Sequence, residues 1–155
     1  TAEYYAQRAD PERGAGLRTD DLTTAALAAA KNCYRLLRER GSETMLMPAA
    51  FRAGRQVTEL AGGVVEMTIH PKIQAEIAAT DAGTPIPRER RIDAEVDRAA
   101  VDRVAEALPE FLLGYDPDAL VLGQFDSFGA TRLTLDGFQS SGWAPLRETF
   151  AGSRA

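Results

Sequence analysis

The sequence is poor in the residue types that build disulfides, metal centres and amine chemistry. It contains one cysteine and one histidine in 155 residues, so it has neither a disulfide framework nor a Cys/His cluster of metal-ligand spacing. Only Lys31 and Lys72 among its 18 cationic residues are lysines. A reaction that needs a lysine amine therefore has two candidates in this chain.

The sequence also lacks a long apolar run and an excess of positive charge. No stretch reaches the roughly 18 apolar residues of a membrane-spanning helix. The net charge of −5 argues against a nucleic-acid surface, because such surfaces usually carry a basic face. The first residues lack the charged-then-apolar order of a signal peptide and an initiator methionine. These absences, with the lone Cys33, predict a cytoplasmic chain without membrane or nucleic-acid partners, cut from a longer one.

What is present is a globular composition with clear helical periodicity. The chain is 45% apolar and 26% charged, which suits a folded domain. Apolar residues at helical spacing predict helices over 19–40, 71–83 and 93–108, with Gly41 ending the first in a left-handed conformation. Residues 1–18 predict a helical turn and a loop, 84–87 a break, and 110–155 an interrupted helical extension.

Between the first two helices, the pattern predicts a parallel crossover. Short apolar runs at 44–47 and 64–69 are typical of strands buried on both faces, and a short helix over 56–61 joins them. The loop after the first strand carries Arg52 and Arg55. Loops at this end of a parallel unit face the ligand side, so two guanidiniums there predict an anion site.

Three segments of this region resemble the C-terminal part of the transaldolase family. They read M-P-A-A-F-R at 47–52, L-A-G-G at 60–63 and M-T-I-H-P-K at 67–72, where the family has M-G-A-S-F-R, L-A-G-C and L-T-I-S-P-K-L. The resemblance covers roughly residues 22–77. It implies an α/β fold: the last two βα units of a (β/α)8 TIM barrel over residues 1–83, then a helical extension over 84–155 that packs on the barrel.

The resemblance also implies an activity. Transaldolases are transferases of carbohydrate metabolism, in the pentose phosphate pathway, that move a dihydroxyacetone unit between sugar phosphates through a lysine Schiff base, without a metal or an organic cofactor. Arg52 matches the arginine that binds substrate phosphate, and Arg55 is the second candidate for this role. Ala50, Phe51 and His70 are expected to lie beside the site.

Departures from the family pattern limit this expectation. Ala50 replaces the serine whose hydroxyl assists at the phosphate, and Pro48 replaces a glycine. Neither Lys31, in mid-helix, nor Lys72, after the second strand, matches the Schiff-base lysine, which is expected upstream of this chain. No catalytic residue is therefore assigned here, and the remainder of the barrel is an expected partner.

Two alternatives stay open. The chain could be a relative without transaldolase activity, serving as a sugar-binding or structural subunit or acting on an unphosphorylated or specialised sugar. It could also be a small helical domain with a two-strand insert. A row of aromatic residues in the extension predicts packing on the barrel or between the subunits of a homo-oligomer: Phe125, Phe128, Phe138 and Trp143.

Overall fold

The computed structural model describes residues 11–83 and 88–152. The helical turn expected before residue 11 and the break expected at 84–87 lie outside these ranges. The first helices are α2 (Pro11–Gly14), α3 (Thr19–Glu39), α4 (Gly54–Thr58) and α5 (Pro71–Gly83). They are followed by α6 (Arg98–Ala107), α7 (Glu110–Tyr115), the 3-10 helix η2 (Leu122–Ser127), α8 (Gly129–Gly137), the π-helix η3 (Phe138–Trp143) and α9 (Ala144–Gly152).

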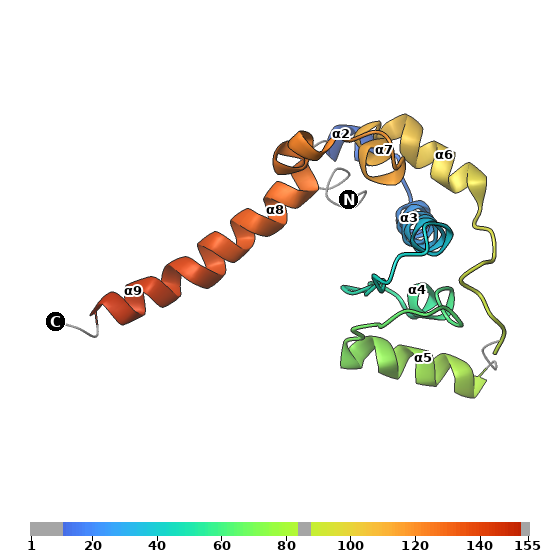
Figure 1. The fold of residues 1–155 in the computed structure, drawn as a ribbon. Helices are drawn as coiled ribbons and strands as arrows, with labels where there is room; N and C mark the ends of the chain where they lie inside the picture. The colour runs from blue at the N-terminus through green and yellow to red at the C-terminus, as the bar shows by residue number, and fades with distance from the viewer. Residues whose placement is uncertain (1–10, 84–87, 153–155) are drawn as a thin grey trace.

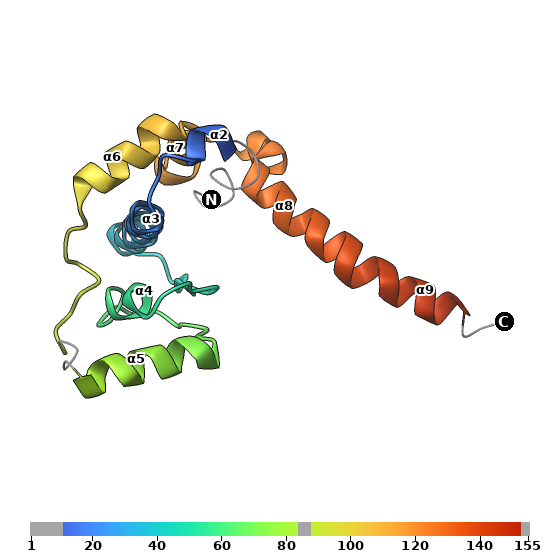
Figure 2. The same cartoon turned by 180° about the vertical axis from the view of Figure 1, so that it is seen from behind.

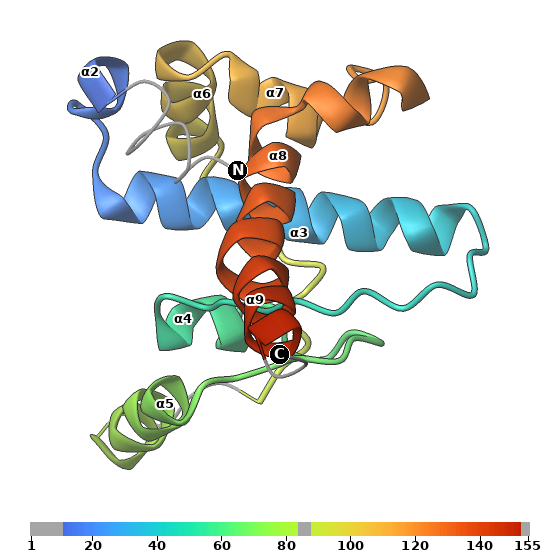
Figure 3. The ribbon, with the colours of Figure 1, turned by 90° about the vertical axis from the view of Figure 1, so that its left-hand side faces the viewer.

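Helix α3 lies at the centre of the packed part of the molecule. Figure 1 views it end-on, with α6 and α7 on one side and α4 and α5 on the other; Figure 3 shows its full length beside the extended segments. Asp20 and Asp21 stand in its positive first turn and Arg38 in its last, which complements the helix dipole. Gly41 follows with φ of 59°, as predicted, and ends the helix.

Two hydrophobic clusters cover opposite sides of α3. On one side, small side chains allow close approach of α6 and α7; the buried members are Ala25, Ala28, Val101, Val104, Leu108 and Phe111. On the other side, Leu27 and Tyr34 of α3 meet Leu60 and Ile92. The predicted division at residue 84 separates segments that share these clusters, since α3 comes from the first part and α6 from the second.

The predicted α/β fold is wrong for the described residues. Segments 44–47 and 64–69 do run side by side in parallel, and the N–H groups of Glu66 and Thr68 donate to the carbonyls of Leu46 and Pro48, each at 3.1 Å. They form only an isolated bridge between Leu46 and Val65, so the described chain contains no regular strand, sheet or barrel.

The reason is that only some of the apolar residues in these segments are buried. Leu46, Val65 and Met67 pack on the cluster beside α3, whereas Met45, Met47 and Val64 are exposed. The sequence suggested burial on both faces, but the described helices cover one face only. Two extended segments without a third cannot make a stable open sheet.

Gly62 allows the end of this crossover to lie against the connection to α6. Gly62 has φ of 84°, and a Cβ there would lie 2.8 Å from the Cα of Arg90. The N–H groups of Arg91 and Ile92 donate to the carbonyl of Ala61 at 3.0 and 3.1 Å. The connection is thereby held against the crossover, which encloses the second cluster.

The helices were predicted better than the strands. Helices α3 and α5 match their predicted ranges, whereas α4 begins two residues earlier and ends three residues earlier than predicted. Helix α6 begins later, at Arg98, because the Asp97 carboxylate caps it by accepting from the Ala99 N–H at 3.0 Å. The extension is helical with interruptions, as expected. However, α8, η3 and α9 form one long helix that projects away from the layers around α3 (Figures 1 and 2), rather than packing over them.

Candidate functional site

The arginine loop is anchored to the first turn of α4. The Gln56 side-chain oxygen Oε1 accepts from the N–H of Arg52 at 2.6 Å and from the N–H of Ala53 at 3.3 Å. The N–H of Gly54 donates to the Glu76 carboxylate of α5 at 2.8 Å. Side chains of α4 and α5 therefore fix the backbone that carries Arg52.

Ala50 has an unusual backbone conformation in this loop. Its φ of 57° lies in the left-handed region, which side chains other than glycine rarely adopt. Such strain costs on the order of 1 kcal/mol or more and is concentrated at binding and catalytic sites. The position where the resembling family has serine is therefore the strained residue of this loop.

A cavity of about 610 Å³ lies between this loop and one face of α3. Leu27, Leu60 and Phe111 are its buried apolar residues. The residues that line it are Thr19, Leu22, Thr23, Ala26, Leu27, Ala29, Ala30, Pro48, Ala49, Ala50, Phe51, Arg52, Gln56, Leu60 and Phe111. Its size falls within the range of about 300–1,000 Å³ that is common for small-molecule sites.

The structure brings three of the predicted site residues to this cavity. Ala50, Phe51 and Arg52 all line it. Phe51 is half-buried and also packs on the second hydrophobic cluster. Arg52 is exposed, and its Nη1 donates to the carbonyl of Ala50 at 3.3 Å. A guanidinium thus stands on the wall of a mostly apolar cavity.

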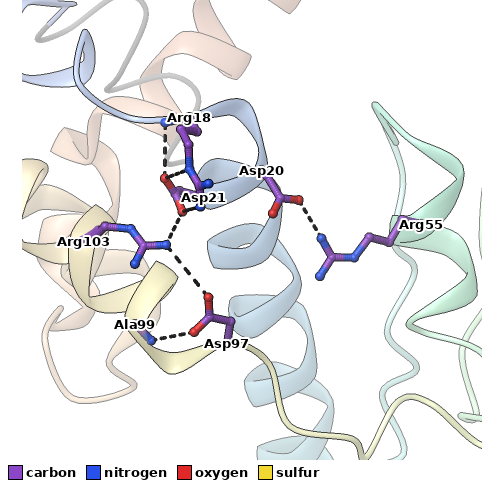
Figure 4. A network of polar contacts seen from close by, with 7 residues as sticks. All are labelled: Arg18, Asp20, Asp21, Arg55, Asp97, Ala99 and Arg103. Atoms are coloured by element: carbon purple, nitrogen blue, oxygen red, sulfur yellow. Dashed lines mark hydrogen bonds and ion pairs between the residues drawn. The ribbon is translucent and has the colours of Figure 1, made fainter.

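Arg55 and His70 are placed elsewhere. The Arg55 guanidinium donates to the Asp20 carboxylate at 2.6 Å (Figure 4), and Arg55 is not among the residues that line the cavity. His70 is exposed, and its Nδ1 accepts from the N–H of Lys72 at 3.2 Å at the start of α5. Their predicted parts in phosphate binding and around the active site stay predictions.

The first turn of α3 carries a second set of ion pairs beside Thr19 of the cavity wall. Asp21 is buried and accepts from Arg18 Nε and Nη2 at 3.2 and 3.1 Å and from Arg103 Nη2 at 2.5 Å, as Figure 4 shows. The hydrogen bonds from Arg18 and then Arg103 hold the pKa of the Asp21 carboxyl well below its usual range. Both first-turn carboxylates are thus paired with arginines.

We expect Asp21→Asn to destabilise the protein at neutral pH and to have less effect in acid. Because folding lowers the Asp21 pKa, its charge stabilises the fold above the unfolded-state pKa of about 4, and this contribution is lost as the pH falls further. Urea unfolding of both proteins at pH 7, 5 and 3 measures this. If the wild type and Asp21→Asn differ in free energy of unfolding by the same amount at all three pH values, the Asp21 charge does not cause the destabilisation.

The sequence did not indicate the α3 wall of the cavity. Thr19, Leu22, Thr23, Ala26 and Ala30 recur at spacings of three or four residues, so they share one helical face. The threonine pair four residues apart is a weak signal of a polar edge on an apolar face. Phe111 comes from a distant helix, and no local pattern connects it to the loop.

In the described ranges, no group of three or more His, Cys, Asp or Glu residues is placed to hold a metal ion. No helix in those ranges has the length and apolarity to cross a membrane. Comparison with known proteins does not extend these observations. The chain matches no family model, no curated protein and no solved structure.

Proposed function

We propose that this chain binds a small phosphorylated sugar in the cavity beside α3, with Arg52 as the phosphate ligand. The observation that supports this most strongly is the position of Arg52, which lies on the cavity wall next to the strained residue Ala50. A guanidinium offers planar, charge-assisted donors that suit phosphate oxygens. The apolar residues of the cavity suit the carbon face of a sugar.

The start of α3 adds to the electrostatic argument. Thr19, the first residue of this 21-residue helix, lines the cavity, and the N-terminal end of a helix dipole favours an anion. Asp20 and Asp21 would oppose this, but Asp20 is paired with Arg55, and Asp21 with Arg18 and Arg103. In this proposal Arg55 acts indirectly, by neutralising the carboxylate next to Thr19.

The transaldolase-like transfer is part of the proposal, with the Schiff-base amine supplied from outside this chain. The Lys31 amine donates to the Glu59 carboxylate and to the carbonyls of Arg91 and Ala94, at 3.1, 2.9 and 2.9 Å. Lys72 is exposed on α5 and does not line the cavity. The alternative, a sugar-binding subunit without transferase activity, is favoured by Ala50. The lone Cys33 supports a reducing, cytoplasmic setting for either function.

We expect Arg52→Ala to weaken binding of fructose 6-phosphate by about 10- to 100-fold, the loss of about 1.5–3 kcal/mol that a charged hydrogen bond contributes. Calorimetric titration of the wild type and the variant measures this. Separate titrations with fructose and with inorganic phosphate show how much of the affinity comes from the sugar and how much from the phosphate. Arg98→Ala is the matched control, because Arg98 is an exposed arginine paired with Asp102 on α6.

Two outcomes of this titration would contradict the proposal: no binding of fructose 6-phosphate by the wild type, or equal loss in the Arg52 and Arg98 variants. Arg55→Ala is measured beside them. A loss as large as that of Arg52→Ala for inorganic phosphate alone would make Arg55 a direct phosphate ligand. A smaller loss would support its indirect role through Asp20.

The transfer reaction has a separate test. Borohydride reduction in the presence of fructose 6-phosphate traps a Schiff base as a stable adduct, which peptide mass spectrometry can locate. We expect an adduct on a lysine outside residues 1–155 of the intact protein. An adduct on Lys31 or Lys72 would contradict the assignment, and binding without any adduct would support the non-catalytic alternative.

A further inference from the structure

The projecting helix formed by α8, η3 and α9 exposes a row of large apolar side chains. Figures 1 and 2 show that it extends away from the layers around α3. The row consists of Leu135, Phe138, Trp143, Leu146 and Phe150, which are exposed by 50%, 70%, 56%, 52% and 68%. We call these five residues the apolar stripe.

The π-helical turn brings the stripe onto one face. Leu135 and Phe138 are three residues apart, and Trp143, Leu146 and Phe150 follow at spacings of three and four, which an α-helix places on one side. Phe138 and Trp143 are five residues apart, which an α-helix would offset. They bound η3, whose hydrogen bonds span five residues and restore the alignment.

The local sequence explains why the π turn occurs there. Pro145 has no N–H to donate one turn back, and its ring crowds the preceding turn. The N–H of Ala144 donates instead to the carbonyl of Gln139, five residues earlier. Gly142 and the serines before it make this backbone easy to deform. The turn therefore follows from proline and glycine placed between the two halves of the stripe.

The stripe is large enough to form an interface. Since a fully exposed aromatic side chain presents about 150–250 Å², the five exposed side chains together leave roughly 500 Å² of apolar surface in water. Exposed apolar patches of this size mark interaction sites. Two such patches pressed together would bury about 1,000 Å², which is the lower limit for a specific interface between proteins.

The order of side chains in the stripe favours a second copy of the same chain as the partner. Along the helix, a leucine, two aromatic residues and a second leucine follow one another at spacings of three, five and three residues. The order of residue types and spacings is therefore the same in both chain directions for Leu135, Phe138, Trp143 and Leu146. An antiparallel pairing about the centre of η3 would set Leu135 against the partner's Leu146 and Phe138 against the partner's Trp143. A two-fold interface requires this self-complementarity.

We propose that the apolar stripe is a dimerisation surface, through which two copies pair antiparallel by their projecting helices. Antiparallel pairing also sets Arg132, which is ion-paired with Asp136 at 2.9 Å, near the partner's Thr149, and Arg147 near the partner's Thr134. Because the pairing uses only the projecting helix, each chain of the dimer keeps its own cavity beside α3.

Sedimentation velocity over a range of concentrations tests the dimer. We expect the wild type to change from monomer to dimer with rising concentration, and Phe138→Ser with Trp143→Ser to stay monomeric throughout. Leu122→Ser is the control, because Leu122 is exposed by 87% but lies in η2, outside the stripe. A wild type that stays monomeric at the highest concentration, or a control that weakens the dimer as much as the stripe variants do, overturns the proposal.

Changes of helical register provide a test that keeps the stripe residues. Deleting Ser141 together with Pro145→Ala puts Phe138 and Trp143 four residues apart and removes the proline that favours the π turn, so an ordinary α-helix keeps them on one face and the dimer should persist. Inserting one alanine after Ser140 puts them six residues apart and should abolish it. Circular dichroism checks that both variants remain folded. If both variants lose the dimer, or if neither does, the dimer does not depend on one continuous apolar face.

Spin labels test the direction of pairing. In a Cys33→Ser background, a label at Arg132→Cys lies about 13 Å along the helix from the centre of the stripe. Antiparallel pairing therefore places the two labels of a dimer about 25 Å apart, measured by double electron–electron resonance. Parallel pairing would bring them to about the 8–10 Å separation of packed helices and would overturn the antiparallel arrangement.

Discussion

Leu108→Ala is expected to lower the free energy of unfolding by about 3–4 kcal/mol, one of the two largest effects that the structure predicts. Leu108 is 0% exposed and contributes to the cluster between α3 and the α6–α7 pair. Shortening its isobutyl side chain to a methyl group leaves a cavity that neighbours held in helices cannot fill. The position also joins α6 to α7, since the N–H of Phe111 donates to its carbonyl at 2.9 Å.

Leu122→Ala is the matched control for this prediction. The same atoms are removed from a side chain that is 87% exposed, so we expect the free energy of unfolding to change by less than about 0.5 kcal/mol. Urea unfolding followed by circular dichroism measures both variants. Equal losses in the two would show that Leu108 is not in the core that stabilises α3.

Lys31→Met is the other large effect, with an expected loss of about 2–3 kcal/mol in the free energy of unfolding. Lys31 is buried, and its three hydrogen bonds connect α3 to Glu59 and to the connection before α6. Methionine keeps the length and apolar contacts of the lysine stem. The lower free energy of unfolding would therefore result from the lost hydrogen bonds of the amine rather than from a cavity.

The same substitution at Lys72 controls for the general effect of removing a lysine. Lys72 is exposed on α5, and we expect Lys72→Met to have an effect below about 0.5 kcal/mol. If Lys31→Met is as mild as Lys72→Met in urea unfolding, the buried network does not hold these segments together.

The partner of Lys31 adds a dependence on pH. Burial raises the pKa of the Glu59 carboxyl, but the hydrogen bonds from Arg91 and Lys31 outweigh it, and the pKa lies below its ordinary value. The stabilisation from this charge is complete above the unfolded-state pKa of about 4 and is lost as the pH falls below it. The difference between the wild type and Lys31→Met should therefore narrow in acid.

The helices could be predicted because their signals are local. In α3, the acidic first turn, the apolar spacing and Gly41 all lie within one stretch, and the structure confirms the helix, its acidic first turn and Gly41. Cys33 shows where this approach stops: it stands on an apolar helix face by spacing, yet it is exposed. Periodicity identifies a face, but another element must cover it before the face becomes core.

Part of the cavity wall could be read from the sequence, for the same reason. Ala50, Phe51 and Arg52 are neighbours in sequence, so one motif could indicate all three. The α3 wall and Phe111 reach the cavity only through tertiary packing. Arg55 lies three residues from Arg52, but its contact with Asp20, 35 residues away, could not be read from the loop.

The sequence by itself determined where most helices lie, the glycine that ends α3, the parallel course of the crossover and the basic character of its loop. These depend on interactions within a few residues or on backbone geometry. Only the tertiary structure decided that segments 44–47 and 64–69 do not form a sheet, that α3 lies between two clusters, and that Lys31 is a buried structural residue. Those outcomes depend on which distant segments cover a face or supply a partner charge, and no local pattern contains that information.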